Sequence, residues 1–287
     1  MVQLHKYSGA GNDFVVLDGR TEDVSAYRTP EMISALCAEY GTDGLMILTA
    51  DPDYDFRMEF YNPDGSGGMM CGNGGRCIVA FADALGITPR DGGIFRFVAA
   101  DGEHTGEILA REGLCKTVRL RMIDVRTFHP ALDGWFLDTG TRHFVRFVPD
   151  VEAVDVEEEG RRARWDPVFA PIGANANFVS VDPDGVLHVR TFEKGVEGET
   201  LACGTGITAS AIAAFLASQR TDRNYFSDKF AEKPISAPSS TTPALCSEGS
   251  SVHFDIQARI ARLAVDFRVG SGCFTDVYLT GPADEIR

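Results

Sequence analysis

The sequence predicts an α+β fold of two pseudosymmetric domains, each a curled, mostly antiparallel sheet around a central helix. Two observations support this class. Two short motifs recur in the two halves of the 287 residues, and the second motif lies both times between an alternating strand and an alanine-rich helix. Paired units of this kind imply two related domains facing each other, and the interdomain cleft is the expected active site.

The first repeat is a glycine-rich turn that leads into a strand: residues 9–18 read GAGNDFVVLD, and residues 173–182 read GANANFVSVD. The second repeat is Cys-Gly-x-Gly, which begins at Cys71 and again at Cys203. The distance between copies is far too long for a solenoid. Strands and helices flank the two cysteine motifs at 56–61, 78–85, 187–192 and 207–216.

Other periodic segments complete each half. Alternating apolar patterns predict strands at 45–48, 93–98, 118–122, 135–137, 144–147 and 260–269. The segment 31–39 is predicted to be a helix, because Thr29-Pro30 supplies a cap followed by proline at the first helical position.

The domain boundaries follow from these elements. We expect a first domain at 1–124, to which 276–287 returns, and a second domain at 125–275. The segment 222–251 is rich in Ser, Pro and Thr with little apolar periodicity, which is typical of a long exposed loop.

Composition excludes several classes of function. A net charge of −15, from 27 basic against 42 acidic residues, argues against nucleic-acid binding, which needs a basic stripe. No stretch approaches the ~18 apolar residues of a membrane span. The start of the chain runs directly into strand-like sequence without a leader, so we expect a cytoplasmic protein.

The cysteines are expected to be reduced. Seven cysteines, an odd number scattered through a long chain, do not suit a complete disulfide framework. No cluster has the spacing of a zinc site, so we expect no metal. Five cysteines are interpreted as structural: Cys37, Cys77, Cys115, Cys246 and Cys273.

Cysteines at the starts of two helices predict proton chemistry. Sulfur there lies beside unpaired N–H groups and the positive end of the helix dipole, which favour a thiolate. The ordinary thiol pKa of ~8.5 can fall by several units at such a position, within reach of a general base. The same N–H groups can hold a carboxylate. Cys71 and Cys203 would then act on opposite faces of one α-carbon and invert it.

Each motif alone is a weak signal, because free cysteine often packs as a small hydrophobe. The occurrence of both in matching frames favours chemistry. A Cys/His hydrolase with His143 as its base is an alternative, although it leaves the second cysteine motif unexplained.

Polar motifs at many separated positions form a recognisable series. They are Gly11-Asn12-Asp13-Phe14, Asn62, Asp64-Gly65-Ser66, the run from Cys71 to Cys77, Gly140, His143, Ala174-Asn175, Glu193, Glu199-Thr200, Ala202 to Gly206, and Leu279 to Pro282. In this order they resemble the diaminopimelate epimerase family over nearly the whole chain. The resemblance implies cofactor-independent conversion of LL-diaminopimelate into the meso form, for lysine and peptidoglycan synthesis. It also allows a homodimer.

The resemblance also implies roles for individual residues. Cys203 resembles the base for the LL substrate and Cys71 the acid, with the roles exchanged in reverse. Glu193 and His143 resemble two residues that lie near the thiols and the substrate ammonium and support proton transfer. The implied substrate-binding residues are Asn12, Asn62 and Asn175 for the remote amino-acid end, and Gly72, Asn73, Gly204 and Thr205 for the reacting carboxylate.

Three positions depart from the family pattern. Thr141-Arg142-His143 replaces Asn-Pro-His or Ser-Pro-His, so we expect a guanidinium beside the site. Lys194 replaces an arginine, which keeps the charge for substrate binding but loses bidentate carboxylate recognition. Gly44 replaces a glutamine of some members. These changes leave two alternatives open: a racemase of another amino acid, such as histidine, and a non-catalytic amino-acid-binding protein.

Overall fold

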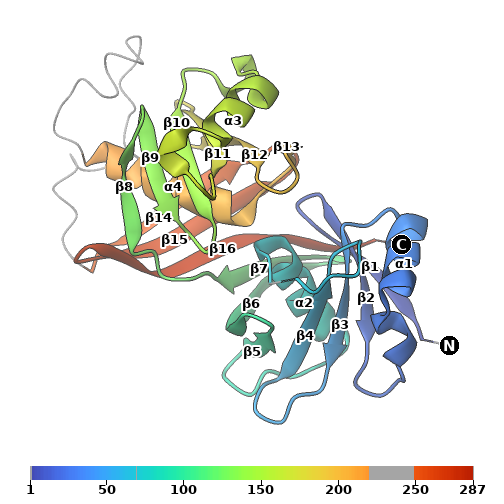
Figure 1. Ribbon diagram of the computed structural model, residues 1–287. Helices are drawn as coiled ribbons and strands as arrows, with labels where there is room; N and C mark the ends of the chain where they lie inside the picture. The colour runs from blue at the N-terminus through green and yellow to red at the C-terminus, as the bar shows by residue number, and fades with distance from the viewer. Residues whose placement is uncertain (1, 69, 220–248, 287) are drawn as a thin grey trace. The chain divides into compact units, whose positions relative to one another are not determined.

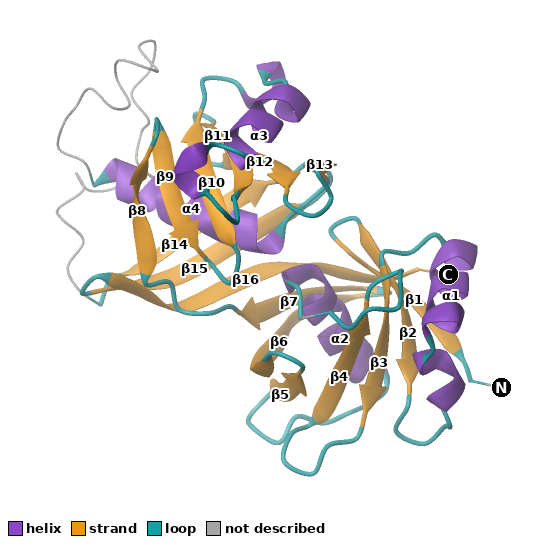
Figure 2. Cartoon of the chain, in the orientation of Figure 1, coloured by secondary structure: helices purple, strands orange, loops and turns teal. Residues whose placement is uncertain are grey.

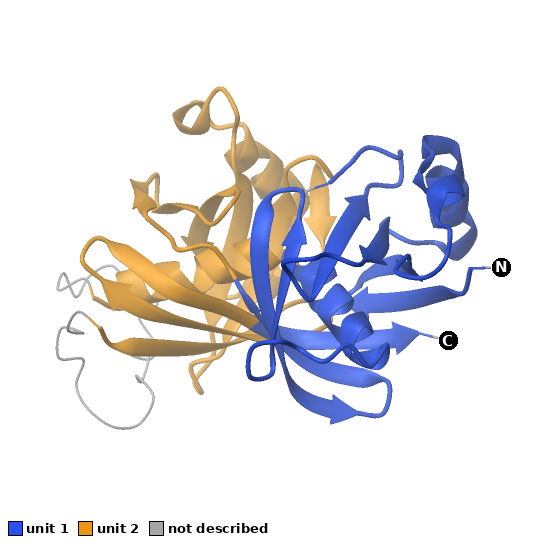
Figure 3. Ribbon diagram, turned by 90° about the horizontal axis from the view of Figure 1, so that it is seen from below, with its two compact units in different colours: residues 1–121, 280–287 blue, residues 122–279 orange. Residues whose placement is uncertain are grey.

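The computed structural model describes residues 2–68, 70–219 and 249–286, and shows helices among many strands (Figures 1 and 2). The chain forms two compact units, one of residues 1–121 with 280–287 and one of residues 122–279 (Figure 3). The predicted α+β class is therefore confirmed. The loop predicted at 222–251 lies outside the described residues except for its last three, where β14 begins.

Unit 1 is a ring of strands. In chain order these are β1 (Leu4–Gly9), β2 (Asn12–Asp18), β3 (Gly44–Thr49), β4 (Phe56–Tyr61), β5 (Ile94–Ala99), β6 (Gly102–Glu112), β7 (Cys115–Arg121) and the end of β16 (Cys273–Ile286). Each strand pairs with the next in this order, and β16 pairs with β1 as well as β7, so the ring closes. Only the β2–β3 and β4–β5 pairs of this ring are parallel.

Helices α1 and α2 belong to this unit (Figure 1). Helix α2 (Gly72–Ala84) contacts β1, β2, β3, β6 and β7, and every residue from Gly72 to Ala82 is buried. Helix α1 (Pro30–Tyr40) packs Ile33 and Leu36 onto a cluster that includes Leu17. It follows a 3-10 turn, η1 (Ser25–Arg28), and begins where predicted, because the Thr29 side chain accepts from the N–H of Met32.

Unit 2 repeats this plan. Its elements are β8 (Thr127–Ala131), β9 (Gly134–Asp138), β10 (Arg142–Phe147), η2 (Val151–Ala153), α3 (Val156–Arg164), η3 (Pro167–Phe169), β11 (Asn175–Val181), β12 (Leu187–Glu193), β13 (Gly198–Thr200), α4 (Gly204–Ser218), β14 (Ser251–Gln257), β15 (Arg262–Gly270) and the start of β16. The strand order is β16-β15-β14-β12-β11-β10-β9-β8. Val125, just before β8, pairs with Phe274 of β16 and links the two ends. Helix α4 is almost wholly buried.

The connectivity of the two units shows which segments are equivalent. The series β1-β2-α1-β3-β4-α2-β5-β6-β7 corresponds to β9-β10-α3-β11-β12-α4-β14-β15-β16, with parallel pairs at the same places. The two cysteine motifs therefore begin equivalent helices, as predicted. The match of residues 9–18 with 173–182 is wrong as a structural repeat, because Asn12 begins β2 whereas Asn175 begins β11, the counterpart of β3.

Three further features concern the classes of function weighed above. Among the described residues, no helix is long and apolar enough to cross a membrane. Within the same ranges, no group of three His, Cys, Asp or Glu side chains is placed to hold a metal ion. The described cysteines are free thiols.

Candidate functional site

Cys71 lies at the N-cap of α2 in extended backbone. Its Sγ accepts a hydrogen bond from the N–H of Gly74 at 3.2 Å. Gly74 permits this close approach, since a Cβ there would lie 3.3 Å from the same sulfur. The half-buried thiol thus lies among the unpaired N–H groups of a buried helix, where a thiolate is stabilised.

A chain of hydrogen bonds links two of the predicted binding residues in unit 1. The Arg76 guanidinium donates to Asn73 Oδ1 at 3.0 Å, and Asn73 Nδ2 donates to Asn12 Oδ1. Asn12 Nδ2 in turn donates to the carboxylate of Asp43 at 3.2 Å. Because a guanidinium only donates and a carboxylate only accepts, both amides have one orientation. The structure therefore brings Asn12 and Asn73 together.

Asn62 lies at the turn that follows β4. Its Nδ2 donates to Ser66 Oγ at 3.0 Å, and its N–H donates to the Ser66 carbonyl at 2.9 Å. Its carbonyl accepts from the N–H of Gly65. These contacts make Asn62 a turn-forming residue in this structure, and its predicted role at the substrate remains a prediction.

Cys203 begins α4 in unit 2, and a hydroxyl group lies beside its sulfur. Its Sγ lies 3.4 Å from Thr205 Oγ1. That hydroxyl lies 2.9 Å from His143 Nε2 and 3.1 Å from Thr141 Oγ1. The structure thus brings Cys203, Thr205 and His143 into one hydrogen-bonded group.

His143 is completely buried, and its neighbours fix its tautomer. Asn177 Nδ2 donates both to the Phe144 carbonyl at 3.0 Å and to His143 Nδ1 at 3.1 Å. Because the Phe144 carbonyl only accepts, the amide nitrogen of Asn177 must face it, and Asn177 Oδ1 then accepts from Thr191. Nδ1 is therefore the acceptor and the ring proton lies on Nε2, since the nearest neighbours of Nε2 are the hydroxyls of Thr141 and Thr205, and Asn175 Nδ2 is farther away, at 3.4 Å.

The pKa of His143 is lowered to about 3, mainly because burial disfavours the charged ring; the charge of Lys194 adds to this effect and the hydrogen bond from Asn177 opposes it. The ring is consequently neutral near pH 7. A neutral ring whose Nδ1 is occupied presents Nε2–H as a donor to the hydroxyls of Thr141 and Thr205. His143 is therefore placed to donate a hydrogen bond rather than to accept a proton.

Asn175, Glu193 and Lys194 lie where β11 and β12 adjoin. Asn175 Oδ1 accepts from the N–H of Lys194 at 2.6 Å, and its Nδ2 donates to the Arg142 carbonyl at 3.1 Å. Burial raises the pKa of Glu193, and the neighbouring Thr200 hydroxyl opposes this. A raised pKa brings a carboxyl group closer to proton exchange at neutral pH.

The guanidinium expected beside the site lies elsewhere. Arg142 Nη1 donates to the Phe169 carbonyl at 3.1 Å, and the guanidinium lies over the Phe136 ring at 5.1 Å. Side chains alternate along β10, so Arg142 and His143 face opposite sides of the sheet. The expectation about Arg142 was therefore wrong.

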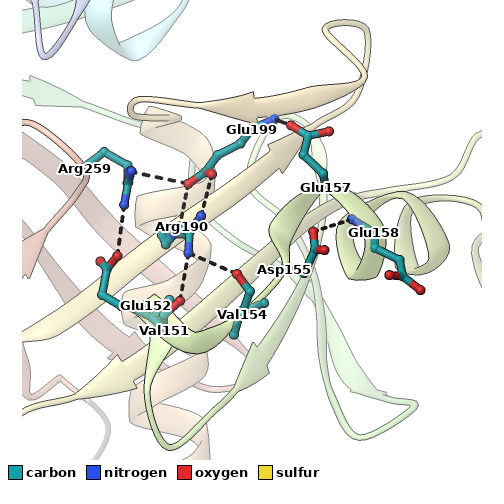
Figure 4. A network of polar contacts seen from close by, with 9 residues as sticks. All are labelled: Val151, Glu152, Val154, Asp155, Glu157, Glu158, Arg190, Glu199 and Arg259. Carbon is teal, nitrogen blue, oxygen red and sulfur yellow. Dashed lines mark hydrogen bonds and ion pairs between the residues drawn. The ribbon is translucent and has the colours of Figure 1, made fainter.

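An ion-pair network fixes the hairpin that connects Glu193 with Cys203 (Figure 4). Arg190 of β12 makes a bidentate pair with Glu199 of β13, at 2.7 and 2.6 Å. Further contacts link this pair to the residues in and just before α3. Arg190 donates to the carbonyls of Val151 and Val154, and the N–H of Glu199 donates to the Glu157 carboxylate. Arg259 lies between the carboxylates of Glu199 and Glu152. Because part-buried bidentate pairs are geometrically specific, this network fixes the position of β13, the strand that leads to Cys203.

Comparisons with known proteins agree with the motifs. The sequence pattern described as diaminopimelate epimerase matches residues 4–108 and 135–231. A diaminopimelate epimerase of Flavobacterium psychrophilum is 34% identical, covering 99% of this chain and 98% of its own length. One of Chlorobaculum tepidum is 41% identical, covering 72% and 81%. This chain belongs to the diaminopimelate epimerase family. The predicted family and the isomerase class are confirmed.

Solved structures support the fold of this epimerase. A phenazine biosynthesis protein from Bacillus anthracis superimposes with a TM-score of 0.63 at 12% identity, covering 100% of this chain and 96% of its own. A hydroxyproline epimerase from Agrobacterium vitis gives 0.62 at 15% identity, covering 99% and 89%. At these identities the likeness shows the architecture alone.

Sequence reasoning gave no role to two residues that organise the epimerase's polar networks. Arg76 is a charged residue inside an otherwise apolar helical pattern, which is a signal of a partnered buried charge. Asn177 lies two residues after Asn175 on one strand, so both side chains share a face. Both signals were present in the sequence.

Proposed function

We propose that this epimerase interconverts LL- and meso-diaminopimelate, with Cys203 and Cys71 acting on opposite faces of one α-carbon. The observation that carries the proposal is that each cysteine begins the buried central helix of its unit, at equivalent places in the two chain paths. The relatives named diaminopimelate epimerase support the choice of substrate. The proposed reaction uses amino-acid side chains alone. It would serve the synthesis of lysine and of peptidoglycan precursors.

In the forward direction the Cys203 thiolate removes the α-proton of the LL substrate and becomes a thiol. The electron pair left on carbon delocalises into the adjacent carboxylate. The Cys71 thiol gives its proton to the opposite face of the carbon and becomes a thiolate. Helix N-termini stabilise the added negative charge, because their N–H groups and dipoles favour anions. The reverse reaction exchanges the two roles.

The neutral His143 suggests how Cys203 holds a negative charge. With Nε2–H donating to Thr205 Oγ1, the hydroxyl proton of Thr205 can point at Thr141 Oγ1, 3.1 Å away, or at the Cys203 sulfur, 3.4 Å away, and a thiolate favours the second. Donation to the thiolate lowers the energy of the charged form. His143 and Thr205 would thus prepare the base without carrying its proton.

The remaining polar residues are proposed to bind the substrate. Asn73, Thr205 and the backbone of the two helix starts would hold the reacting carboxylate. Glu193 would meet the ammonium, and Lys194 would contribute its charge. The amides proposed for the remote amino-acid end are those of Asn12, Asn62 and Asn175.

The test is α-hydrogen exchange in heavy water. Incubation with LL-diaminopimelate should yield meso-diaminopimelate carrying one deuterium at the inverted carbon, detected by mass spectrometry and proton NMR. Histidine and other single-centre amino acids serve as matched controls. Faster exchange with one of those would identify a racemase of another substrate, and binding without exchange would identify a binding protein. Either result contradicts the proposal.

A further inference from the structure

Arg76 is a fully buried cation whose charge the mechanism above leaves unused. Its guanidinium donates to the Gly72 carbonyl and Asn73 Oδ1, each at 3.0 Å, and to the Pro282 carbonyl at 3.2 Å. All three acceptors are neutral. A buried charge is costly unless an opposite charge compensates it.

The position of the guanidinium increases that cost. It folds back onto Gly72 and Asn73, the first two residues of α2, where the helix dipole is already positive. Arginine keeps its proton in proteins. The site therefore calls for an anion near the N-terminus of α2.

Two thiols lie near enough to influence the titration of Arg76, those of Cys71 and Cys77. Burial raises the pKa of Cys77 far above its ordinary value, so Cys77 stays protonated. Cys71, which is half-buried and accepts from the N–H of Gly74, is left as the thiol that can carry the compensating charge.

Unit 2 provides a natural counterpart. Arg76 stands five residues after Cys71, and Thr208 stands five residues after Cys203. Thr208 Oγ1 donates to the Gly204 carbonyl at 3.0 Å, the bond equivalent to that of Arg76 with Gly72. The same acceptor is thus satisfied by a neutral group in one unit and by a cation in the other.

We propose that Arg76 is the counter-charge of the Cys71 thiolate and makes Cys71 the more acidic of the two helix-start thiols in the free enzyme. Arg76 is a positioning residue that acts on the thiol through its charge. The inference deepens the proposed function, since it assigns the resting thiolate to Cys71. The unliganded enzyme then waits in the state that accepts the meso substrate.

The test is the pH dependence of alkylation by iodoacetamide, followed separately at Cys71 and Cys203 by peptide mass spectrometry. In the wild type, Cys71 should reach its half-maximal rate at a lower pH than Cys203. Arg76→Gln keeps polar contacts but removes the charge, and should slow Cys71 alkylation at neutral pH about tenfold, since a one-unit rise in pKa leaves a tenth of the thiolate. Arg76→Lys keeps the charge and should retain most of the rate.

Thr208→Val is the matched control, and should leave the profile of Cys71 unchanged. Equal shifts in the Gln and Lys variants would show a packing effect and overturn the proposal, as would a Cys203 profile at the lower pH. Failure of the wild type to exchange α-hydrogen would instead contradict the proposed function, because alkylation does not depend on turnover.

A second measurement needs no change at Arg76, should its variants fail to fold. In a Cys203→Ala background, Cys71 is alkylated either with iodoacetate, which adds a carboxylate, or with iodoacetamide, which adds a neutral group of similar size. The carboxylate adduct should unfold at the higher temperature, because it supplies the anion that Arg76 lacks. Equal melting temperatures, or the reverse order, would overturn the proposal.

Discussion

The starts of α2 and α4 share one backbone plan and differ in the side chains around the sulfur. In both, a cysteine precedes a buried helix, and glycines follow it one and three residues later. Around Cys71 the network is charged at both ends, from Arg76 to Asp43. Around Cys203 it is neutral, from Asn177 through His143 to Thr205.

This difference shows that a helix start favours a thiolate in both units, while the neighbouring side chains determine how strongly each thiolate is stabilised. A buried cation stabilises an anion at all times. A hydroxyl that receives one hydrogen bond and gives another stabilises it only when its proton points at the sulfur. The two thiols of this epimerase are therefore expected to be unequal, although the chain builds both with the same motif.

Removing either cysteine should have the largest effect on activity. Cys71→Ala and Cys203→Ala should each lower epimerisation about 100- to 10,000-fold, the range for loss of an acid–base group. Cys71→Ala should still exchange the α-hydrogen of the LL substrate through Cys203, without forming product. Cys203→Ala should exchange only at the D centre of the meso substrate. Deuterium incorporation by each variant checks this, and exchange of both substrates by both variants would contradict separate faces.

Replacing His143 in the hydrogen-bonded network of unit 2 should have the next largest effect on the rate. His143→Ala should reduce the rate about 10- to 100-fold, because a hydrogen bond that serves a charged group is worth about 1.5–3 kcal/mol. His143→Gln places an N–H near the position of Nε2–H and should recover most of that loss. The ratio of kcat values of the two variants is the measurement. If His143 accepted a proton instead, glutamine would be as poor as alanine.

Much of this site was accessible from sequence. Cys-Gly-x-Gly predicts a helix start because the residue types themselves determine the local backbone, and β4 appears at the residues that its alternation predicts. Arg142 was misjudged because its side of the sheet depends on the register of β10 against β9 and β11. The neutrality of His143 depends on burial by residues distant in sequence, which a local pattern does not contain.

The segment at Asn12 and its echo at Asn175 show a second limit. Both have glycine followed by a strand that starts with asparagine, because both leave a tight turn and enter a sheet. Similar turns therefore give similar sequences at positions that are not topologically equivalent. The cysteine motif is a more reliable sign of equivalence, because the helix that follows it is buried over most of its length and few positions in the fold can hold such a helix.

Gly74 and Gly206, which directly follow Asn73 and Thr205, have different neighbours. An added methyl group should therefore destabilise the two helix starts to different extents. At Gly206 a Cβ would lie 2.4 Å from Asn177 Oδ1 and 3.3 Å from His143 Cε1, so Gly206→Ala should destabilise by about 1–3 kcal/mol. At Gly74 the nearest atom is the Cys71 sulfur at 3.3 Å, and Gly74→Ala should cost less. Denaturant unfolding measures both, and equal losses would contradict the difference.

Over the single pH unit below pH 6, the smallest effect is the acid sensitivity of unit 2. The pKa of His143 is about 3 in the folded chain against 6.5 for the free side chain, because burial disfavours the imidazolium. Above pH 6.5 both states hold a neutral ring and folding is unaffected. Below pH 6.5 the unfolded chain binds a proton that the folded chain does not, so stability falls by at most about 1.4 kcal/mol for each pH unit until about pH 3.

Both tryptophans, Trp135 and Trp165, lie in unit 2, so their fluorescence follows its unfolding in denaturant. The wild type should lose stability between pH 6 and pH 5, and His143→Gln should lose less, because glutamine does not titrate. The difference between the two proteins removes the contribution of Glu193, whose raised pKa acts in the opposite direction. Parallel pH profiles would mean that His143 takes up a proton in the folded state, and the neutral donor network around Cys203 would then have to be replaced by a charged one like that of Cys71.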